Sequence, residues 1–149
     1  MNTINYFKLQ AKNLFKDYKT KTIHDYLSGY TPKYFDVDGI ICDFDLDERD
    51  FTLMNAQHIV AQLCGFEKWT ALLKASASEL ELAKLLFDHQ NIAHVDSWMD
   101  YITYAQEMNQ TTFETETKIE IFKQVILTRQ VVLDAVPGYL LKQESPSQR

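Results

Sequence analysis

Apolar side chains recur every three or four positions over most of the chain, which is the spacing of residues on one face of a helix. The first such stretch covers Thr3–Tyr18, and its recurring residues are Ile4, Phe7, Ala11, Leu14, Phe15 and Tyr18. An amphipathic helix buries a stripe of this kind against a core. The pattern therefore predicts a helix over Thr3–Tyr18, and Thr22–Leu27 is compatible with a further short helical turn.

The same period returns beyond residue 50 and continues toward Pro137. Five apolar stripes define further helices, and they carry in order Leu53, Ala56, Val60, Leu63 and Cys64; Trp69, Leu72 and Leu73; Leu80, Ala83, Leu86 and Phe87; Val95, Trp98, Met99, Ile102 and Ala105; and Ile119, Phe122, Val125, Ile126 and Leu133. We expect Trp69 to be a buried anchor between the two helices around Gly65. Short connections between about six helices predict one all-α domain.

Polar residues mark where these helices begin. Three helix starts carry side chains that can cap them: Asp50 or Thr52, Ser76 with Glu79, and Thr111 with Glu114. The last two pairs have the spacing of a capping box, in which each residue's side chain bonds the other's backbone N–H. Gly65 stands where a helix commonly ends in a left-handed residue, so a positive φ is expected there.

An irregular acidic segment is predicted between the first and second long helices, from Ser28 to Asp50. Glycines and a proline interrupt the helical period there. A short extended piece at Gly39–Phe44 is compatible with its β-branched and aromatic residues. We expect the helical domain to span residues 1–142 and residues 143–149 to form a disordered C-terminal tail.

Composition narrows the class of protein. The net charge of −6 disfavours a general nucleic-acid binder, which needs clustered Lys and Arg, and also disfavours an anionic membrane surface. Two cysteines without a Cys-x-x-Cys pair favour a reducing compartment. Met1–Gln10 lacks the apolar run of a signal peptide, and no apolar stretch has the length of a membrane span. We therefore expect a cytoplasmic protein.

The acidic segment contains a candidate catalytic motif. Asp36-x-Asp38-Gly39 resembles the first motif of haloacid-dehalogenase-type phosphotransferases. The resemblance implies that the first Asp attacks phosphorus, that the second acts as a general acid and base, and that both help to hold magnesium. That family places a buried strand before the first Asp, whereas only two aromatic residues precede it here. A small metal-dependent hydrolase or phosphotransferase using the Asp36–Asp50 carboxylates is the alternative hypothesis for function.

A calcium loop is a second interpretation of the same acids. Asp43, Asp45 and Asp47 fall at the first, third and fifth positions of such a loop. Glu48 then stands where glycine is required, and Met54 stands where a bidentate glutamate is required. We therefore expect no dedicated metal site and no cofactor.

The helix pair around Gly65 has features of a DNA-binding motif. Ala61 and Gly65 have the spacing of a helix-turn-helix, where a small residue lets two helices cross closely and glycine forms the turn. The second helix offers Glu67, Thr70 and two lysines rather than a row of Arg, Asn or Gln. DNA binding is the third hypothesis.

The same stretch resembles a small helical module found at the N-terminus of bacterial glyoxalase-related proteins and in bacterial proteins of unassigned role. The matching positions are Ala56, Gln57, Ala61, Gly65, Phe66, Trp69 and Leu72. The opening helix of the module is similar to Ala11, Lys12 and Leu14, so the resemblance covers about Phe7–Tyr18 and Phe51–Ala75. It implies a helix pair and a bacterial source. Glyoxalase activity is not implied, because the residues that follow are predicted to be helical.

A non-enzymatic interaction or regulatory module is the function that these observations favour. Aromatic residues make up 13% of the chain, and tyrosines are enriched at protein interfaces. We expect binding to another protein or to a second copy of the chain, with the acidic loop steering a basic partner. The candidate binding residues are Tyr34, Asp43, Asp45, Asp47, Tyr101 and Tyr104, with Tyr26 and Tyr30 near the first of them.

Overall fold

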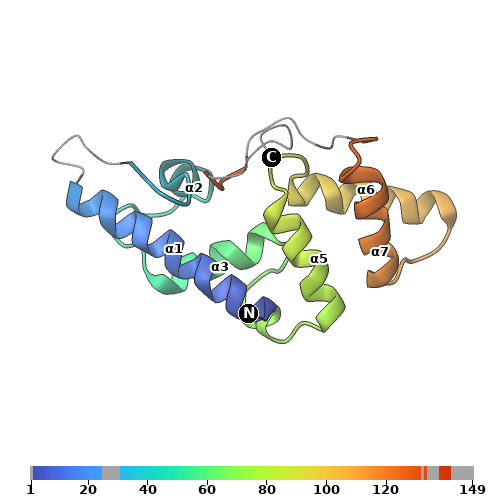
Figure 1. Cartoon of the computed structure of the whole chain (residues 1–149), viewed down its shortest axis with the longest axis horizontal. Helices are drawn as coiled ribbons and strands as arrows, with labels where there is room; N and C mark the ends of the chain where they lie inside the picture. The colour runs from blue at the N-terminus through green and yellow to red at the C-terminus, as the bar shows by residue number, and fades with distance from the viewer. Residues whose placement is uncertain (1, 25–30, 132, 134–137, 142–149) are drawn as a thin grey trace. The chain divides into compact units, whose positions relative to one another are not determined.

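The computed structural model of the chain describes residues 2–24, 31–131, 133 and 138–141 (Figure 1). The α-helices are α1 (Thr3–His24), α2 (Val37–Asp43), α3 (Leu53–Leu63), α4 (Trp69–Leu73), α5 (Ala77–Asp88), α6 (Val95–Asn109) and α7 (Thr115–Ile121), followed by the π-helical turn η2 (Phe122–Ile126). Within those residues there is no strand, and Phe35 and Leu140 form an isolated antiparallel bridge. The predicted all-α class is confirmed. Tyr26, Tyr30 and the predicted disordered tail, residues 143–149, lie outside the described residues.

The chain divides into two compact units. The first unit comprises Met1–Val60 with Tyr139–Arg149, and the second comprises Ala61–Gly138. The boundary falls inside α3, because Leu53–Val60 belongs to the first unit and the last turn to the second. The hydrophobic period continues across this boundary, so the sequence pattern did not separate the two units.

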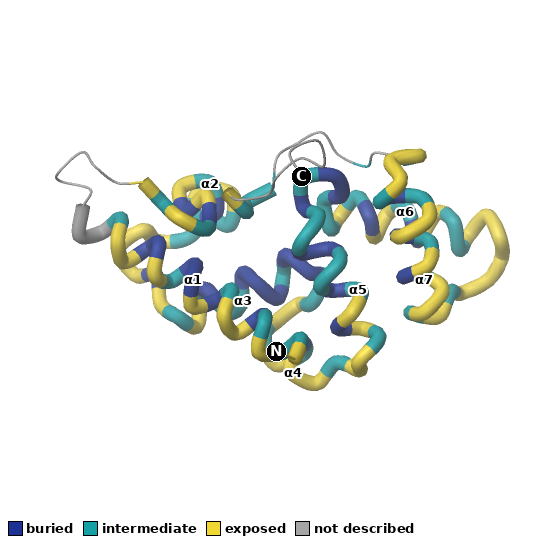
Figure 2. The backbone as a smooth tube through the Cα atoms, in the orientation of Figure 1, coloured by how far each residue is buried: buried dark blue, intermediate teal, exposed yellow. Residues whose placement is uncertain are grey.

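The core of the first unit begins on α1. Phe7, Ala11, Leu14 and Tyr18 are buried, so the predicted stripe of this helix is confirmed at these positions. Figure 2 shows buried and exposed stretches alternating along the helix, as expected for an amphipathic element. The ring of Tyr18 lies 4.9 Å from the buried ring of Phe51, measured between centroids.

The prediction of an extended piece at Gly39–Phe44 is wrong, because α2 covers Val37–Asp43. Asp36 is the N-cap, and its carboxylate accepts a hydrogen bond from the backbone N–H of Gly39 at 3.1 Å. Val37 and Ile40 lie three positions apart and are both buried. A capping aspartate and a helical pair of core residues therefore outweigh the β propensity of this short stretch.

The second unit has its own core. The cluster of buried residues comprises Leu86, Ile92, Ala93, Trp98, Ile102, Phe122 and Ile126. The Trp98 and Phe122 rings pack edge to face, with centroids 5.1 Å apart. Leu80, Ala83, Leu86 and Phe87 of α5 are all buried, which confirms the stripe predicted for this helix.

The local signals at helix ends are confirmed at three positions and wrong at one. Ser76 and Glu79 form the predicted capping box at α5, Thr52 Oγ1 accepts the Asn55 N–H at 3.1 Å, and Gly65 has a φ of +96°. Thr111 does not cap the next helix, because Glu114 is its N-cap. The Thr111 N–H instead bonds the Gln106 carbonyl at 3.1 Å, so this residue completes the end of α6.

The prediction that Trp69 is a buried anchor between the two helices is wrong, because Trp69 is only half-buried. α4 is a single short turn of Trp69–Leu73, and it buries Leu72 completely while Leu73 is 37% exposed. One turn of helix points few residues toward a core. Leu72 is therefore the residue that anchors α4 in the core, and Trp69 is only partly covered.

Candidate functional site

The predicted binding residues are distributed over both units. Tyr34, Asp43, Asp45 and Asp47 belong to the first unit, and Tyr101 and Tyr104 belong to the second. Each group is therefore a candidate surface of its own unit.

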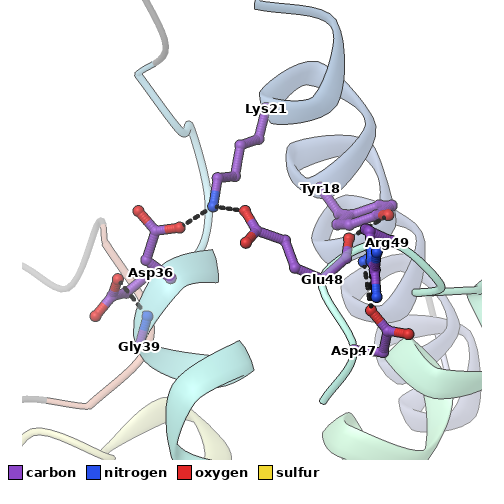
Figure 3. Close-up of polar contacts among 8 residues, drawn as sticks. Tyr18, Lys21, Asp36, Gly39, Asp47, Glu48 and Arg49 are labelled. Atoms are coloured by element: carbon purple, nitrogen blue, oxygen red, sulfur yellow. Dashed lines mark hydrogen bonds and ion pairs between the residues drawn. The ribbon is translucent and has the colours of Figure 1, made fainter. Parts of the chain in front are cut away.

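In the acidic segment of the first unit, Asp38 and Glu48 are both paired with Lys21 of α1, an arrangement that we call the lysine clamp. The Lys21 ammonium donates a hydrogen bond to Glu48 Oε1 at 2.5 Å (Figure 3). It donates a second hydrogen bond to Asp38. The Lys21 side chain is only 12% exposed. Burial alone would lower the pKa of Lys21, but the hydrogen bonds and charges of Asp38 and Glu48 outweigh burial and raise the pKa above its usual range. Lys21 thus joins α1 to α2 and to the end of the acidic segment at Glu48.

Other residues of this segment have separate partners. The Tyr18 hydroxyl donates to the Glu48 carbonyl at 2.7 Å. The Asp47 carboxylate accepts the Arg49 N–H at 2.9 Å and lies 3.6 Å from the Arg49 guanidinium in an exposed pair (Figure 3). Asp45 is exposed and has a φ of +52°, so it occupies a turn.

The predicted residue Asp43 contacts a distant part of the sequence. The Tyr139 hydroxyl donates to Asp43 Oδ2 at 2.5 Å. Burial, together with this hydrogen bond and the negative charge of Asp43, raises the pKa of Tyr139 above its usual range. The backbone around Tyr139 pairs with the predicted residue Tyr34 and its neighbours, since the Leu141 N–H bonds the Tyr34 carbonyl at 3.0 Å. Tyr34 and Asp43 therefore hold residues 139–141 in place.

Asp17 is a polar core residue that the sequence reasoning missed. Its side chain accepts backbone N–H groups from Lys33, Tyr34 and Phe35 at 2.8–3.1 Å. The residue is only 3% exposed, so these bonds replace the water that its carboxylate loses on burial. The signal was present in the sequence, because Asp17 and Lys21 both fall on the apolar face of α1 with Leu14 and Tyr18.

These partners assign structural roles to the acids proposed for catalysis. Asp36 caps α2, and Asp38 pairs with Lys21. In the part of the chain that the structure describes, no three His, Cys, Asp or Glu side chains are arranged to hold a metal ion. The Lys21 ammonium offsets part of the negative charge of Asp38 and Glu48.

The second unit contains a pocket of about 380 Å³. Its lining comes from the Gly65 turn, α5, α6 and the start of α7, and includes Leu82, Leu86, Trp98, Met99 and Ile102 as apolar walls. Glu79, Thr103, Thr115 and Lys118 add polar groups. Cys64 also lines the pocket, but its thiol is 4% exposed and donates to the Ala61 carbonyl at 3.5 Å. Burial raises the pKa of this thiol, which disfavours a nucleophilic thiolate.

Large exposed side chains gather on another side of α6. Tyr104 is 63% exposed and Met108 is 66% exposed, and they lie four positions apart. Tyr101 lies three positions before Tyr104, is half-buried, and stacks on Trp98 at a centroid distance of 6.2 Å. We call Tyr101, Tyr104 and Met108 the outer face of α6. The structure thus brings Tyr101 and Tyr104 together with a methionine that the sequence reasoning had not singled out.

The predicted helix pair around Gly65 has buried small residues at its centre. Ala56, Ala61 and Leu72 are completely buried, whereas Gln57, Phe66 and Trp69 are half-buried. The Phe66 N–H bonds the Ala61 carbonyl at 3.0 Å across the Gly65 turn. The helix after the turn has only five residues, Trp69–Leu73, none of which is Arg, Lys, Asn or Gln. A recognition helix reads base edges mainly with these residue types.

Comparison of the chain with protein-family models, with curated proteins and with solved structures finds no match. Among the described residues, no helix combines the length and the apolar character needed to cross a membrane.

Proposed function

We propose that this chain is a non-enzymatic interaction module that binds another protein through the outer face of α6. The observation that carries the proposal is the exposure of Tyr104 and Met108 on one helix face beside Tyr101. Aromatic side chains and methionines are enriched in the cores of protein interfaces, because they contribute large apolar area. A methionine can also adapt its shape to the surface of a partner.

Charge around this face defines the kind of partner. α6 carries Asp96, Asp100 and Glu107 and contains no Lys or Arg. Asp100 and Glu107 are exposed and lie four positions before and three positions after Tyr104. A basic partner with apolar side chains complements this helix, and the net charge of −6 would steer it toward the surface. Two copies of the same acidic helix would repel each other, so a different protein is favoured over self-association.

The proposal places the protein in the cytoplasm of a bacterium. Cys42 is an exposed thiol, which suits a reducing compartment. The bacterial source rests on the resemblance of Ala56–Leu72 to the glyoxalase-related helical module.

Co-purification of a stoichiometric partner from the source organism, followed by binding measurements with the purified pair, tests this function. The double variant Tyr104→Ala/Met108→Ala should weaken binding by at least about tenfold, since truncating a hot-spot side chain such as an interface tyrosine costs about 2 kcal/mol or more. Met54→Ala is the matched control, because Met54 is 76% exposed but belongs to the first unit. Association should also slow as the salt concentration rises.

Two results would refute the proposal. One is a partner that binds the double variant and the wild-type chain equally well. The other is a strictly monomeric chain that binds no partner and catalyses a hydrolysis abolished by Asp36→Asn, since that outcome would support the enzyme hypothesis.

A further inference from the structure

The pocket of the second unit has the composition of a small-molecule site. Its volume of about 380 Å³ falls within the range of about 300–1,000 Å³ that is usual for ligand pockets. Leu86, Trp98 and Ile102 are almost fully buried side chains that belong to the core cluster and also form the pocket walls. A ligand would therefore meet walls that are already held in place by the core.

The pocket is separate from the outer face of α6. Met99, Thr103 and Gln106 of this helix line the pocket, whereas Tyr101, Tyr104 and Met108 do not. The inference drawn from the pocket consequently does not depend on the interaction proposed above.

One charge of each sign accompanies the apolar walls. Glu79 at the start of α5 and Lys118 on α7 are the charged members among the lining residues that the structure describes. The hydrogen bonds from Ser76 lower the pKa of Glu79, and the positive charge of Lys118 lowers it further. Glu79 is therefore an anion at neutral pH, and Lys118 is near enough to interact with it. Thr103 and Thr115 supply hydroxyl groups to the same pocket.

The apolar walls together with Glu79 and Lys118 favour one class of ligand over others. An apolar carboxylate would pair with Lys118 but would be repelled by Glu79, and an apolar amine would meet the opposite conflict. A zwitterion satisfies both charges at once. We propose that the pocket binds a free α-amino acid with an apolar side chain, whose side chain contacts Trp98, Leu86 and Ile102 while its ammonium and carboxylate face Glu79 and Lys118.

Trp98 provides a direct readout, because it lines the pocket and is only 2% exposed. The chain has one other tryptophan, Trp69, which does not line the pocket, so Trp69→Phe leaves Trp98 as the sole tryptophan. Excitation at the red edge of the tryptophan absorption band, where tyrosine does not absorb, then reports on Trp98 alone. In this background, leucine and phenylalanine are titrated and the saturation of the fluorescence change is measured. The comparison ligands are 4-methylpentanoate, which lacks the ammonium of leucine, and 3-methylbutylamine, which lacks its carboxylate.

The expected result is saturable binding of leucine or phenylalanine, with each comparison ligand weaker by about tenfold or more, the size of one lost hydrogen bond to a charged group. Glu79→Gln should weaken amino-acid binding by a similar factor while keeping α5 capped, because glutamine also serves in a capping box. Lys118→Met should do the same. Lys123→Met is the control, since Lys123 pairs with Glu81 at 3.4 Å and does not line the pocket.

Two outcomes would overturn the inference. The first is the absence of a saturable response to both amino acids. The second is equal binding of leucine and 4-methylpentanoate, which would show that Glu79 recognises no ammonium. Because the ligand series uses wild-type pocket residues, it decides the question even where a pocket variant fails to fold.

Discussion

The substitution Gly65→Ala tests the turn on which both the helix pair and the pocket depend. Gly65 has a φ of +96°, which disfavours every residue with a Cβ atom and costs about 1–2 kcal/mol. A Cβ at this position would also lie 2.7 Å from Met99 Cε. Met99 is 42% exposed, so its terminal methyl can rotate away at a cost of about 0.5–1.5 kcal/mol. The summed loss of unfolding free energy is therefore about 1.5–3.5 kcal/mol.

A double-mutant cycle with Met99→Ala separates the two contributions. Urea unfolding followed by far-ultraviolet circular dichroism measures the free energy of each variant. In the Met99→Ala background the steric conflict is absent, so Gly65→Ala should still cost about 1–2 kcal/mol from backbone conformation alone. The reasoning is refuted if Gly65→Ala costs less than about 0.5 kcal/mol, the range of a neutral surface substitution. It is also refuted if the entire loss disappears in the Met99→Ala background.

Three further predictions concern local chemistry. The raised pKa values of Lys21 and Tyr139 mean that both groups bind their protons more tightly in the folded chain, so their stabilisation is present below about pH 10 and is lost as the pH rises further. Urea midpoints measured on either side of that pH should show the loss of stability. The double variant Lys21→Met/Tyr139→Phe should show a smaller difference between the two midpoints. Ser76→Ala should cost about 1 kcal/mol in thermal unfolding by removing the capping box, whereas an unchanged melting temperature would contradict it. A thiol reagent should modify exposed Cys42 in the native chain and buried Cys64 only after unfolding, as mass spectrometry of the labelled peptides would reveal; equal rates would be inconsistent with the buried thiol.

The sequence by itself determined the features that depend on neighbours in the chain. The capping box of Ser76 and Glu79 and the positive φ of Gly65 were predicted because a helix end is stabilised by residues within one turn of it. The buried stripes of α1 and α5 were predicted because the helical period places their residues on one face. The enrichment of tyrosines at interfaces made Tyr101 and Tyr104 candidates, but it could not tell that Tyr104 is exposed while Tyr101 stacks on Trp98.

Only the tertiary structure decided which charged groups pair across long stretches of sequence. Lys21 bonds Glu48, Asp17 bonds the backbone of Phe35, and Tyr139 bonds Asp43 across 96 positions of sequence. No periodic pattern encodes such pairs, because each depends on where the chain returns after a turn whose geometry the pattern leaves open. From the sequence alone, the acids of residues 36–50 therefore suggested catalysis or steering of a partner. In the fold, Asp36 caps α2, Asp38 and Glu48 pair with Lys21, and Asp43 accepts a hydrogen bond from Tyr139. The pocket also depends on the tertiary structure. Glu79 and Lys118 lie on different helices, and only the packing of these helices brings the two opposite charges to one apolar cavity.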